Sequence, residues 1–480
     1  AFAVILMLLD NPDLILDGGC RLSFCAVIGV GWYVSEKNKI FRSIGEKEKR
    51  KNRGKGGKGS SAGAILENIR AGWYLWLFTL PVMLDTFYQV SVVGLLWNLV
   101  AIPLLPVIIA SGGLGVVLAG WNIFLGSLAG SPAYGMLQLY QEIGNISEKL
   151  PVGMWTPGQP SKPVIAGYYL VIFLLVLVEK QLIKREKRWK IFPGMELCSM
   201  LLLLLLMAHP WQQREKITFL DVGQGDASLL QSGGQTLLLD GGSQKNVGTY
   251  VILPYIKQQG ISCLEAVVLT HTDQDHINGV TEVLEEGKKG WLTVKNLMYP
   301  YWMEGTEQGK QLKKLAEEAG ASCRKIRAGD RLTIGKAEAV VLYPKEQEKI
   351  AEPNAGSLVL FWKWEGVRAM FTGDLPEEKE RELLQNLPAC EILQVGHHGS
   401  ATSTCREFLE QVQPSLAVIS CAMKNRYGHP SPDTVDRLKK TGCEIRYTMK
   451  SGAITIRKRG REILVTEYLE HVAGHGVNSN

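Results

Sequence analysis

The chain has 480 residues, too many for a single ordinary hydrophobic core, so at least two domains are expected. Its net charge of +6, from 53 basic and 47 acidic residues, does not by itself indicate a nucleic-acid partner. The nine cysteines are scattered without metal-ligand spacing, which favours buried thiols and argues against a small disulfide-stapled fold.

Residues 1–210 hold most of the long apolar runs. A membrane-spanning helix needs about 20 mainly apolar residues. The candidates are residues 14–34, 73–91, 92–110, 112–130, 164–179 and 191–208. Gly and Pro interrupt several of them, which bundled membrane helices tolerate. We therefore expect an α-helical polytopic membrane region over 1–210, rather than a buried soluble bundle. Because the chain opens inside an apolar run without Met or a basic leader, we expect it to be truncated at its N-terminus.

Two basic segments, 36–59 and 184–190, set the expected orientation. The first carries ten Lys or Arg against three Glu, and cytoplasmic loops are rich in Lys and Arg. With both segments inside, the last span would deliver the rest of the chain to the outer face of a bacterial cytoplasmic membrane. Contact of 36–59 with nucleic acid is the alternative interpretation.

From residue 211 the pattern changes to short apolar strands separated by turns. Strands are expected at 217–222, 227–230, 236–240, 266–270, 338–343, 357–364, 367–372, 391–395 and 416–421. Helices are expected near 247–259, 307–319, 376–386 and 432–441. This interleaving predicts an α/β domain, an αββα sandwich of two sheets flanked by helices, over 211–457. Residues 458–480 are expected to form a polar tail.

A cluster of ionisable residues directly follows the strand expected at 266–270. His271, Asp273, Asp275 and His276 fall within six residues. Imidazole and carboxylate groups at this spacing can serve two divalent ions a few ångströms apart. The alternative, a polar loop with an Asp capping the next helix, explains one carboxylate but not all four side chains.

The cluster resembles the His-x-His-x-Asp-His signature of the metallo-β-lactamase fold, with Asp273 in place of the second His. Segment 220–226 is similar to the opening motif of that fold, and segments 371–375, 395–400 and 427–430 are similar to its later motifs. Joined to the upstream apolar region, the set resembles the ComEC family of competence DNA-uptake channels. Segments 14–23 and 96–106 are similar to its membrane region, so the resemblance covers about 1–457.

The resemblance implies DNA uptake across the cytoplasmic membrane, with a metal-dependent nuclease or phosphodiesterase domain acting on incoming DNA. The implied partners are single- or double-stranded DNA, the lipid bilayer and other competence-machinery proteins, with homo-oligomerisation left open. An alternative is a membrane-tethered metallo-hydrolase of small phosphoesters or esters without a transport role. A non-catalytic DNA-binding module is disfavoured, because clustered charge is costly without a metal.

Site roles follow from the same resemblance. The expected metal ligands are His271, Asp273, Asp275, His276, Asp374 and His397. The first two would hold one ion and the next two the other, with Asp374 bridging. The residues expected to act in catalysis, by orienting phosphate or transferring protons, are Asp275, His398 and His429.

The expected cofactor is a pair of divalent metal ions. No His lies between His276 and Asp374, where the wider fold usually supplies a ligand; the chain offers Asn354-Ala-Gly-Ser357 instead. Oxygen-rich sites favour harder ions, so Mn²⁺ is expected, with Zn²⁺ as the alternative. Asp221 and Asp226 are expected to brace the site loops by hydrogen bonds.

Overall fold

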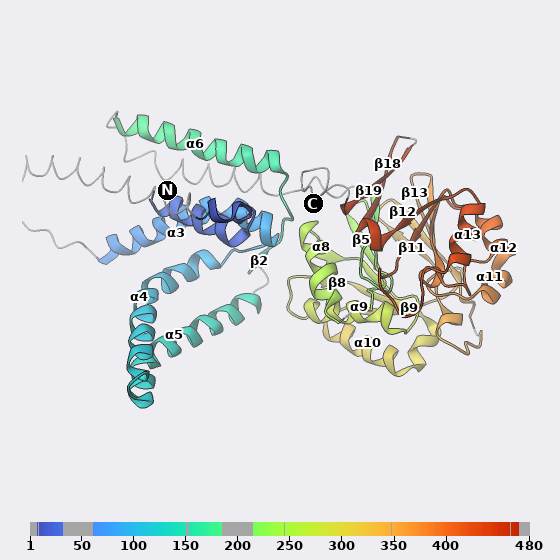
Figure 1. Ribbon diagram of the computed structural model, residues 1–480, viewed down its shortest axis with the longest axis horizontal. Helices are drawn as coiled ribbons and strands as arrows, with labels where there is room; N and C mark the ends of the chain where they lie inside the picture. The colour runs from blue at the N-terminus through green and yellow to red at the C-terminus, as the bar shows by residue number, and fades with distance from the viewer. Residues whose placement is uncertain are drawn as a thin grey trace, which may run out of the picture. The chain divides into compact units, whose positions relative to one another are not determined.

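The computed structural model divides into two compact units, Ala1–His209 and Pro210–Asn480 (Figure 1). It describes residues 7, 9–31, 61–149, 153–184, 215–243, 245–346, 348–460 and 462–469. Several expected features lie outside the described residues. They are the basic loop 36–59, most of the basic segment 184–190, the span at 191–208 and the end of the polar tail.

The first unit is helical. After η1 (Pro12–Ile15) and a helix over 18–31, its elements are α3 (Ser61–Phe87), β1 (Val90–Ser91), α4 (Gly94–Ala119), α5 (Ile123–Lys149), β2 (Met154–Trp155) and α6 (Lys162–Lys184). A small core joins α3 to α6, where Tyr168 and Tyr169 donate to the carbonyls of Leu77 and Phe78. The guanidinium of Arg21 pairs with Asp85 at 2.7 Å.

The helices α4 and α5 form a hairpin whose bounds differ from those expected. The predicted break between 110 and 112 is wrong, because α4 runs through that point to Ala119. The chain turns at 120–122, where the Asn122 side chain accepts from the N–H groups of Phe124 and Leu125. Gly115 lets α4 pack closely against α5, since a Cβ there would lie 3.0 Å from the Gly130 backbone.

Large apolar side chains stay exposed on this hairpin. Val116, Val117 and Trp121 are 76%, 73% and 92% exposed. Within the described ranges, no helix combines the length and the apolar character that a membrane crossing requires. The six crossings expected from the sequence therefore stay a prediction.

The second unit contains two large sheets. Among the described residues, the first has the order β10 (Ser322–Ile326), β9 (Asn296–Pro300), β7 (Ala266–Val268), β5 (Gln235–Leu239), β4 (Ser228–Ser232), β3 (Lys216–Phe219), β18 (Ile454–Arg459) and β19 (Glu462–Glu467). The second has the order β11 (Arg331–Ile334), β12 (Ala337–Tyr343), β13 (Val359–Trp364), β14 (Val367–Phe371), β15 (Ile392–Gln394), β16 (Leu416–Ile419) and β17 (Glu444–Tyr447). Two short strands, β6 (Cys263–Leu264) and β8 (Thr293–Val294), pair separately.

The helices of this unit lie outside the sheets. They are η2 (Gly248–Ile252), α8 (Leu253–Gln258), α9 (Gln274–Gly287), η3 (Tyr301–Gly305), α10 (Glu307–Glu318), η4 (Asn354–Gly356), α11 (Glu377–Leu383), η5 (Leu384–Asn386), η6 (Gly396–Gly399), α12 (Arg406–Val412), α13 (Pro432–Lys440) and α14 (Thr448–Ser451). In Figure 1, α8 to α10 and α11 to α13 lie on opposite sides of this unit.

Three apolar layers hold this arrangement together. The central layer fills the space between the sheets, where the rings of Phe219 and Phe371 stack 5.9 Å apart. A second layer packs α8, α9 and α10 on the first sheet, and a third packs α11, α12 and α13 on the other. The expected αββα sandwich is confirmed.

The end of the sandwich differs from the expected boundary at 457. Residue 457 lies inside β18, and β19 continues the sheet to Glu467 through an antiparallel register that pairs Ile454 with Glu467. Ile463 and Val465 pack against the core while the residue between them is exposed, so this segment forms the edge strand of the sheet. Residues 458–467 therefore belong to the sandwich and not to a tail.

Candidate metal centre

Chain segments from both sheets converge where their strands end. Asp240 directly follows β5, His271 is the third residue after β7, and Asp374 is the third residue after β14. His397 and His398 follow β15 within the tight turn η6. Because β5, β7, β14 and β15 present their carboxyl ends at one edge of the sandwich, residues far apart in the sequence meet there.

The Asp374 carboxylate lies at the middle of the cluster, and its two oxygens face different histidines. Its Oδ1 lies 3.2 Å from His276 Nε2 and 3.6 Å from His398 Nε2. Its Oδ2 lies 3.8 Å from His271 Nε2 and 3.7 Å from His397 Nε2. Two groups of ligand atoms therefore share one carboxylate, as expected of a carboxylate that bridges two ions.

The remaining carboxylates divide between the two sides. Asp275 Oδ2 lies 3.4 Å from His398 Nε2, and Asp226 Oδ1 lies 3.7 Å from His398 Nδ1. On the other side, Asp273 Oδ2 lies 3.8 Å from His271 Nε2. Ligand atoms that share a tetrahedral ion at about 2.1 Å lie about 3.4 Å apart, so these separations fit ligands around shared ions.

Buried polar atoms without partners give an independent test of fit. Ligand atoms of Asp226, His276, Asp374 and His398 lie within 4.8 Å of one another, and all four residues are buried. Among the described residues, the buried side-chain atoms that lack a hydrogen-bond partner include both Asp226 oxygens, Asp374 Oδ1, both ring nitrogens of His398, and Nε2 of His271 and His276. Leaving such atoms unpaired is costly, and metal ions would satisfy them.

Further groups fix the orientation of these side chains. The buried Asp240 accepts from His276 Nδ1 at 2.8 Å and from the N–H of Thr270 at 2.8 Å. This contact leaves His276 Nε2 free to face Asp374, the arrangement in which a carboxylate orients a metal-binding imidazole. The N–H of Asp374 donates to Ser357 Oγ at 3.2 Å. Ser357 therefore helps to hold the backbone of Asp374 in place.

Backbone conformation shapes the site as well. His397 and His398 have φ of 50° and 54°, left-handed values that residues with a Cβ rarely adopt. Such conformations persist at functional sites where the surrounding structure enforces them. Gly225 has φ of 108°, and a Cβ there would lie 2.2 Å from the Asp275 carbonyl oxygen. Gly225 thus lets the loop carrying Asp226 approach the helix that begins beside Asp275.

The charges are strongly coupled. Burial lowers the pKa of His271 to about 3, and the nearby His276 acts in the same direction. Burial alone would raise the pKa of Asp275, but His398 and His276 lower it to about 2. Burial, together with Asp275 and Asp374, raises the pKa of Asp273. At two other histidines the shift is opposite: although burial opposes it, Asp374 and Asp240 raise the pKa of His276, and Asp374 and Asp226 raise that of His398 to about 10. Divalent cations bind neutral imidazole, so cation binding would release protons from these two rings.

The structure brings all six expected metal ligands to this centre and adds Asp226, which had been expected only to brace a loop. His398 is fully buried among the carboxylates, whereas the His397 side chain is 28% exposed. His429 lies at the margin, with its ring 5.6 Å from that of His397 and stacked on Tyr427. Asp221 is not at the centre: it accepts from the N–H of Gly223 and lines a neighbouring cavity.

Sequence reasoning missed Asp240. The signal was present, because Leu237-Leu-Leu-Asp240 places a carboxylate at the end of an apolar strand, as Val268-Leu-Thr-His271 places an imidazole. What the sequence could not show is that β5 and β7 are neighbours in the sheet.

Two family models match the chain. A model described as competence protein matches residues 1–182, and one described as metallo-beta-lactamase superfamily matches residues 220–422. The solved structure of the metallo-beta-lactamase fold protein YhfI from Bacillus subtilis is 13% identical, with a TM-score of 0.36, over 52% of this chain and 100% of that chain.

Curated relatives match both units. ComE operon protein 3 of Bacillus subtilis is 28% identical over 95% of this chain and 57% of its own length. Recombination protein 2 of Haemophilus influenzae is 28% identical over 80% of this chain and 49% of its own length. The chain thus spans about half the length of these relatives. A competence-protein match followed by a metallo-beta-lactamase match fits the ComEC family of competence proteins, as the sequence resemblance had led us to expect.

Proposed function

We propose that this chain acts in the uptake of DNA across the bacterial cytoplasmic membrane, and that its second unit hydrolyses phosphodiester bonds of the incoming DNA. The observation that carries the hydrolytic part is the buried Asp374 carboxylate, whose two oxygens face two separate groups of histidines. The part in DNA uptake rests on the competence-protein match over residues 1–182.

In this proposal each side of Asp374 holds one divalent ion. The ion on the Oδ2 side would be held by His271, Asp273 and His397. The ion on the Oδ1 side would be held by Asp275, His276, Asp226 and His398. Bound ions at such a site supply an activated water and stabilise the attacking and leaving oxygens of a phosphodiester. The centre holds carboxylates from Asp226, Asp273, Asp275 and Asp374, which favours Mn²⁺ over Zn²⁺.

The chain's own residues contribute orientation and proton transfer. Asp240 keeps the His276 ring in place through its 2.8 Å contact with Nδ1. His429 lies half-exposed at the mouth of the centre, where burial and the neighbouring His397 and His398 lower its pKa. A neutral His429 can orient a phosphate oxygen through its N–H or relay a proton to the leaving oxygen.

The first unit is proposed to lie in the membrane. Its α4–α5 hairpin has no charged residue from Gly94 to Gln141, and its exposed side chains include Val116, Val117 and Trp121. Exposed apolar surface of this extent needs a lipid or protein partner. The positive segments 36–59 and 184–190 would then lie inside, and the second unit on the outer face.

The function is tested by measuring cleavage of labelled DNA by the purified chain with Mn²⁺, beside Asp275→Ala. Cleavage that the variant abolishes is the expected result. Turnover of small phosphodiesters with no cleavage of any DNA would favour the tethered small-ester hydrolase instead. Equal cleavage with Asp275→Ala would contradict the proposed centre, and cleavage with Zn²⁺ alone would contradict the preference for Mn²⁺.

A further inference from the structure

Two cavities lie next to the metal centre and share Ala422 and Lys424. The inner cavity, of about 380 Å³, is lined by Asp275 and also by Gln224 and Tyr427. The outer cavity, of about 550 Å³, is lined by Asp221, Lys245, Tyr250, Met423 and Met449 among others. We call this outer cavity the Tyr250 groove. The two cavities form a path that leads away from the metal ligand Asp275.

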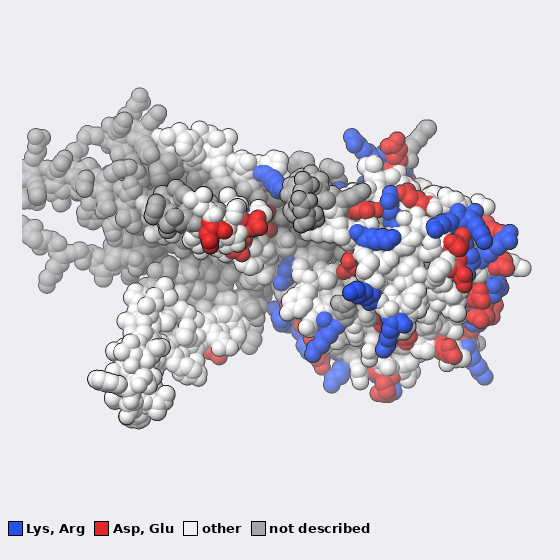
Figure 2. Space-filling view, in the orientation of Figure 1, with Lys and Arg blue, Asp and Glu red and all other residues white. Residues whose placement is uncertain are grey.

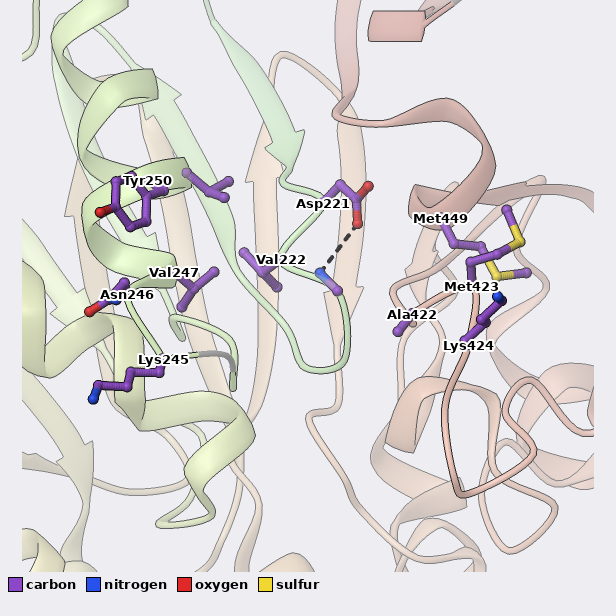
Figure 3. A pocket seen from close by; sticks show the side chains of 12 residues that line it. Asp221, Val222, Lys245, Asn246, Val247, Tyr250, Ala422, Met423, Lys424 and Met449 are labelled. Carbon is purple, nitrogen blue, oxygen red and sulfur yellow. Dashed lines mark hydrogen bonds between the residues drawn. The ribbon is translucent and has the colours of Figure 1, made fainter.

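The Tyr250 groove has two walls, which Figure 3 shows from close by. One wall comes from residues 245–251, including Lys245 and Tyr250, at the start of η2. The other comes from residues 422–424 with Met449. Asp221 lies between them, held by its hydrogen bond from the N–H of Gly223. The groove is therefore an open cavity with two walls, and its volume lies in the range of about 300–1,000 Å³ typical of ligand sites.

The groove presents cations along both walls. The side chains of Lys245 and Lys424 are exposed, and neither has an ion-pair partner among the residues that the structure describes. Arg426 lines the inner cavity, with its guanidinium 4.9 Å from the centre of the Tyr427 ring. Unpaired cations on a path to a phosphodiesterase centre attract the phosphates of a polyanion.

Two large exposed side chains, an aromatic ring and a thioether, accompany these charges. Tyr250 is 74% exposed and Met423 is 64% exposed, on opposite walls. Aromatic rings beside cations are the usual means of binding single strands, since bases stack on the rings while cations contact the backbone. A duplex hides the faces of its bases within its own stack, so it would leave Tyr250 without a partner.

We propose that the Tyr250 groove binds nucleotides of a single DNA strand on one side of the bond being cleaved. Tyr250 stacks on a base, and Lys245 and Lys424 contact phosphates. The Asp221 carboxylate repels phosphate and can accept from a base N–H group, so the phosphates are expected to lie toward the lysines and away from Asp221. The proposal rests on the proposed function, because it assigns the strand that the metal centre cleaves.

The test is direct binding of a short fluorescein-labelled oligothymidine to the full chain in detergent with EDTA, so that no cleavage occurs. Tyr250→Ala should weaken binding about 10-fold through the loss of one stacked base. Tyr250→Phe keeps the ring and should restore the wild-type affinity. A plot of the logarithm of the binding constant against the logarithm of the salt concentration should be less steep for Lys424→Ala by about 0.7, which is the contribution of one phosphate contact with single-stranded DNA.

Lys439→Ala is the matched control, because Lys439 is an exposed lysine of α13 outside both cavities. It should leave the affinity and the salt slope unchanged. Equal affinity of Tyr250→Ala and wild type would overturn the groove assignment, as would a duplex that binds as tightly as the single strand. Binding that depends on Tyr250 without any Mn²⁺-dependent cleavage would contradict the proposed function while supporting the groove.

Discussion

The two units place similar side chains in opposite environments. Trp121, at the tip of the α4–α5 hairpin, is 92% exposed, whereas Trp362, between the two sheets, is 1% exposed. Figure 2 shows the same reversal for charge: on this face the described part of the first unit carries few charged side chains, while the second carries both signs throughout. The second unit completes its own core, and the first leaves apolar surface for a partner.

The two units also differ in how far they bury charged side chains. In the second unit, carboxylates and imidazoles are buried together around Asp374, and many of their polar atoms lack a hydrogen-bond partner among the described residues. In the first, the described ion pair Arg21–Asp85 remains partly exposed. Burying charge is tolerated when ions or ligands compensate it. The first unit thus exposes apolar surface that a partner could cover, and the second gathers buried groups whose charges divalent cations would balance.

The largest expected effect comes from the bridging carboxylate. Asp374→Asn should reduce DNA cleavage by more than the roughly 10–100-fold that outer-shell residues typically contribute to metal sites. The reason is that both groups of histidines lose their shared charge. Steady-state cleavage with saturating Mn²⁺ measures the loss. Activity within 10-fold of wild type would show that Asp374 does not bridge ions.

A charge placed on the hairpin should disturb the first unit alone. Ile109→Asp introduces a carboxylate at an exposed position near the middle of α4, at a cost of about 2.5–3.5 kcal/mol for the centre of a membrane helix. Recovery of the chain in the membrane fraction should therefore fall. Leu464→Asp, an equivalent change at an exposed leucine of β19, is the control. Equal recovery of both variants would argue against lipid as the covering.

A smaller effect is expected for a residue that orients a proposed metal ligand. Asp240→Asn should weaken Mn²⁺ binding by about 10–100-fold, because Asp240 orients His276 without facing the ions. Calorimetric titration of the metal-free chain measures this. If Asp240→Asn weakens Mn²⁺ binding as much as Asp374→Asn does, then Asp240 is itself a metal ligand and its assignment as a group that orients His276 is wrong.

The smallest effect is on stability and concerns Glu380, a buried carboxylate that is not among the proposed metal ligands. It accepts from the N–H groups of Thr404 and Cys405 at 2.7 and 2.8 Å, yet burial raises its pKa from 4.5 to about 7. Between these values the folded chain binds more protons than the unfolded chain, so the unfolding free energy should fall as pH rises from about 4.5 to 7. Thermal melts of Glu380→Gln should lack this component, and identical pH profiles would contradict it.

Much of the second unit could be predicted from sequence. The expected helix at 307–319 is α10, and the expected strand at 338–343 is β12. A periodic apolar pattern indicates which face of a helix or strand is buried, so these elements can be predicted from their own residues. Strands such as β10 and β17 were missed because most of their residues are polar or exposed. Their place depends on sheet neighbours and not on their own pattern.

Part of the candidate metal centre could also be predicted from the sequence. The cluster His271–His276 and Asp374 could be identified because ligands follow apolar strands. Asp240 and Asp226 could not be assigned, since their roles depend on strand order and on a loop that Gly225 brings against Asp275. The Tyr250 groove left no sequence signal, because its walls lie about 170 residues apart in the chain.

The central claim is that the buried cluster around Asp374 is a two-ion centre. Metal analysis of the chain after equilibration with Mn²⁺ and removal of free ion tests it directly. We expect two ions per chain for the wild type and loss of both for Asp374→Asn. A folded wild-type chain that retains neither Mn²⁺ nor Zn²⁺ would contradict the claim.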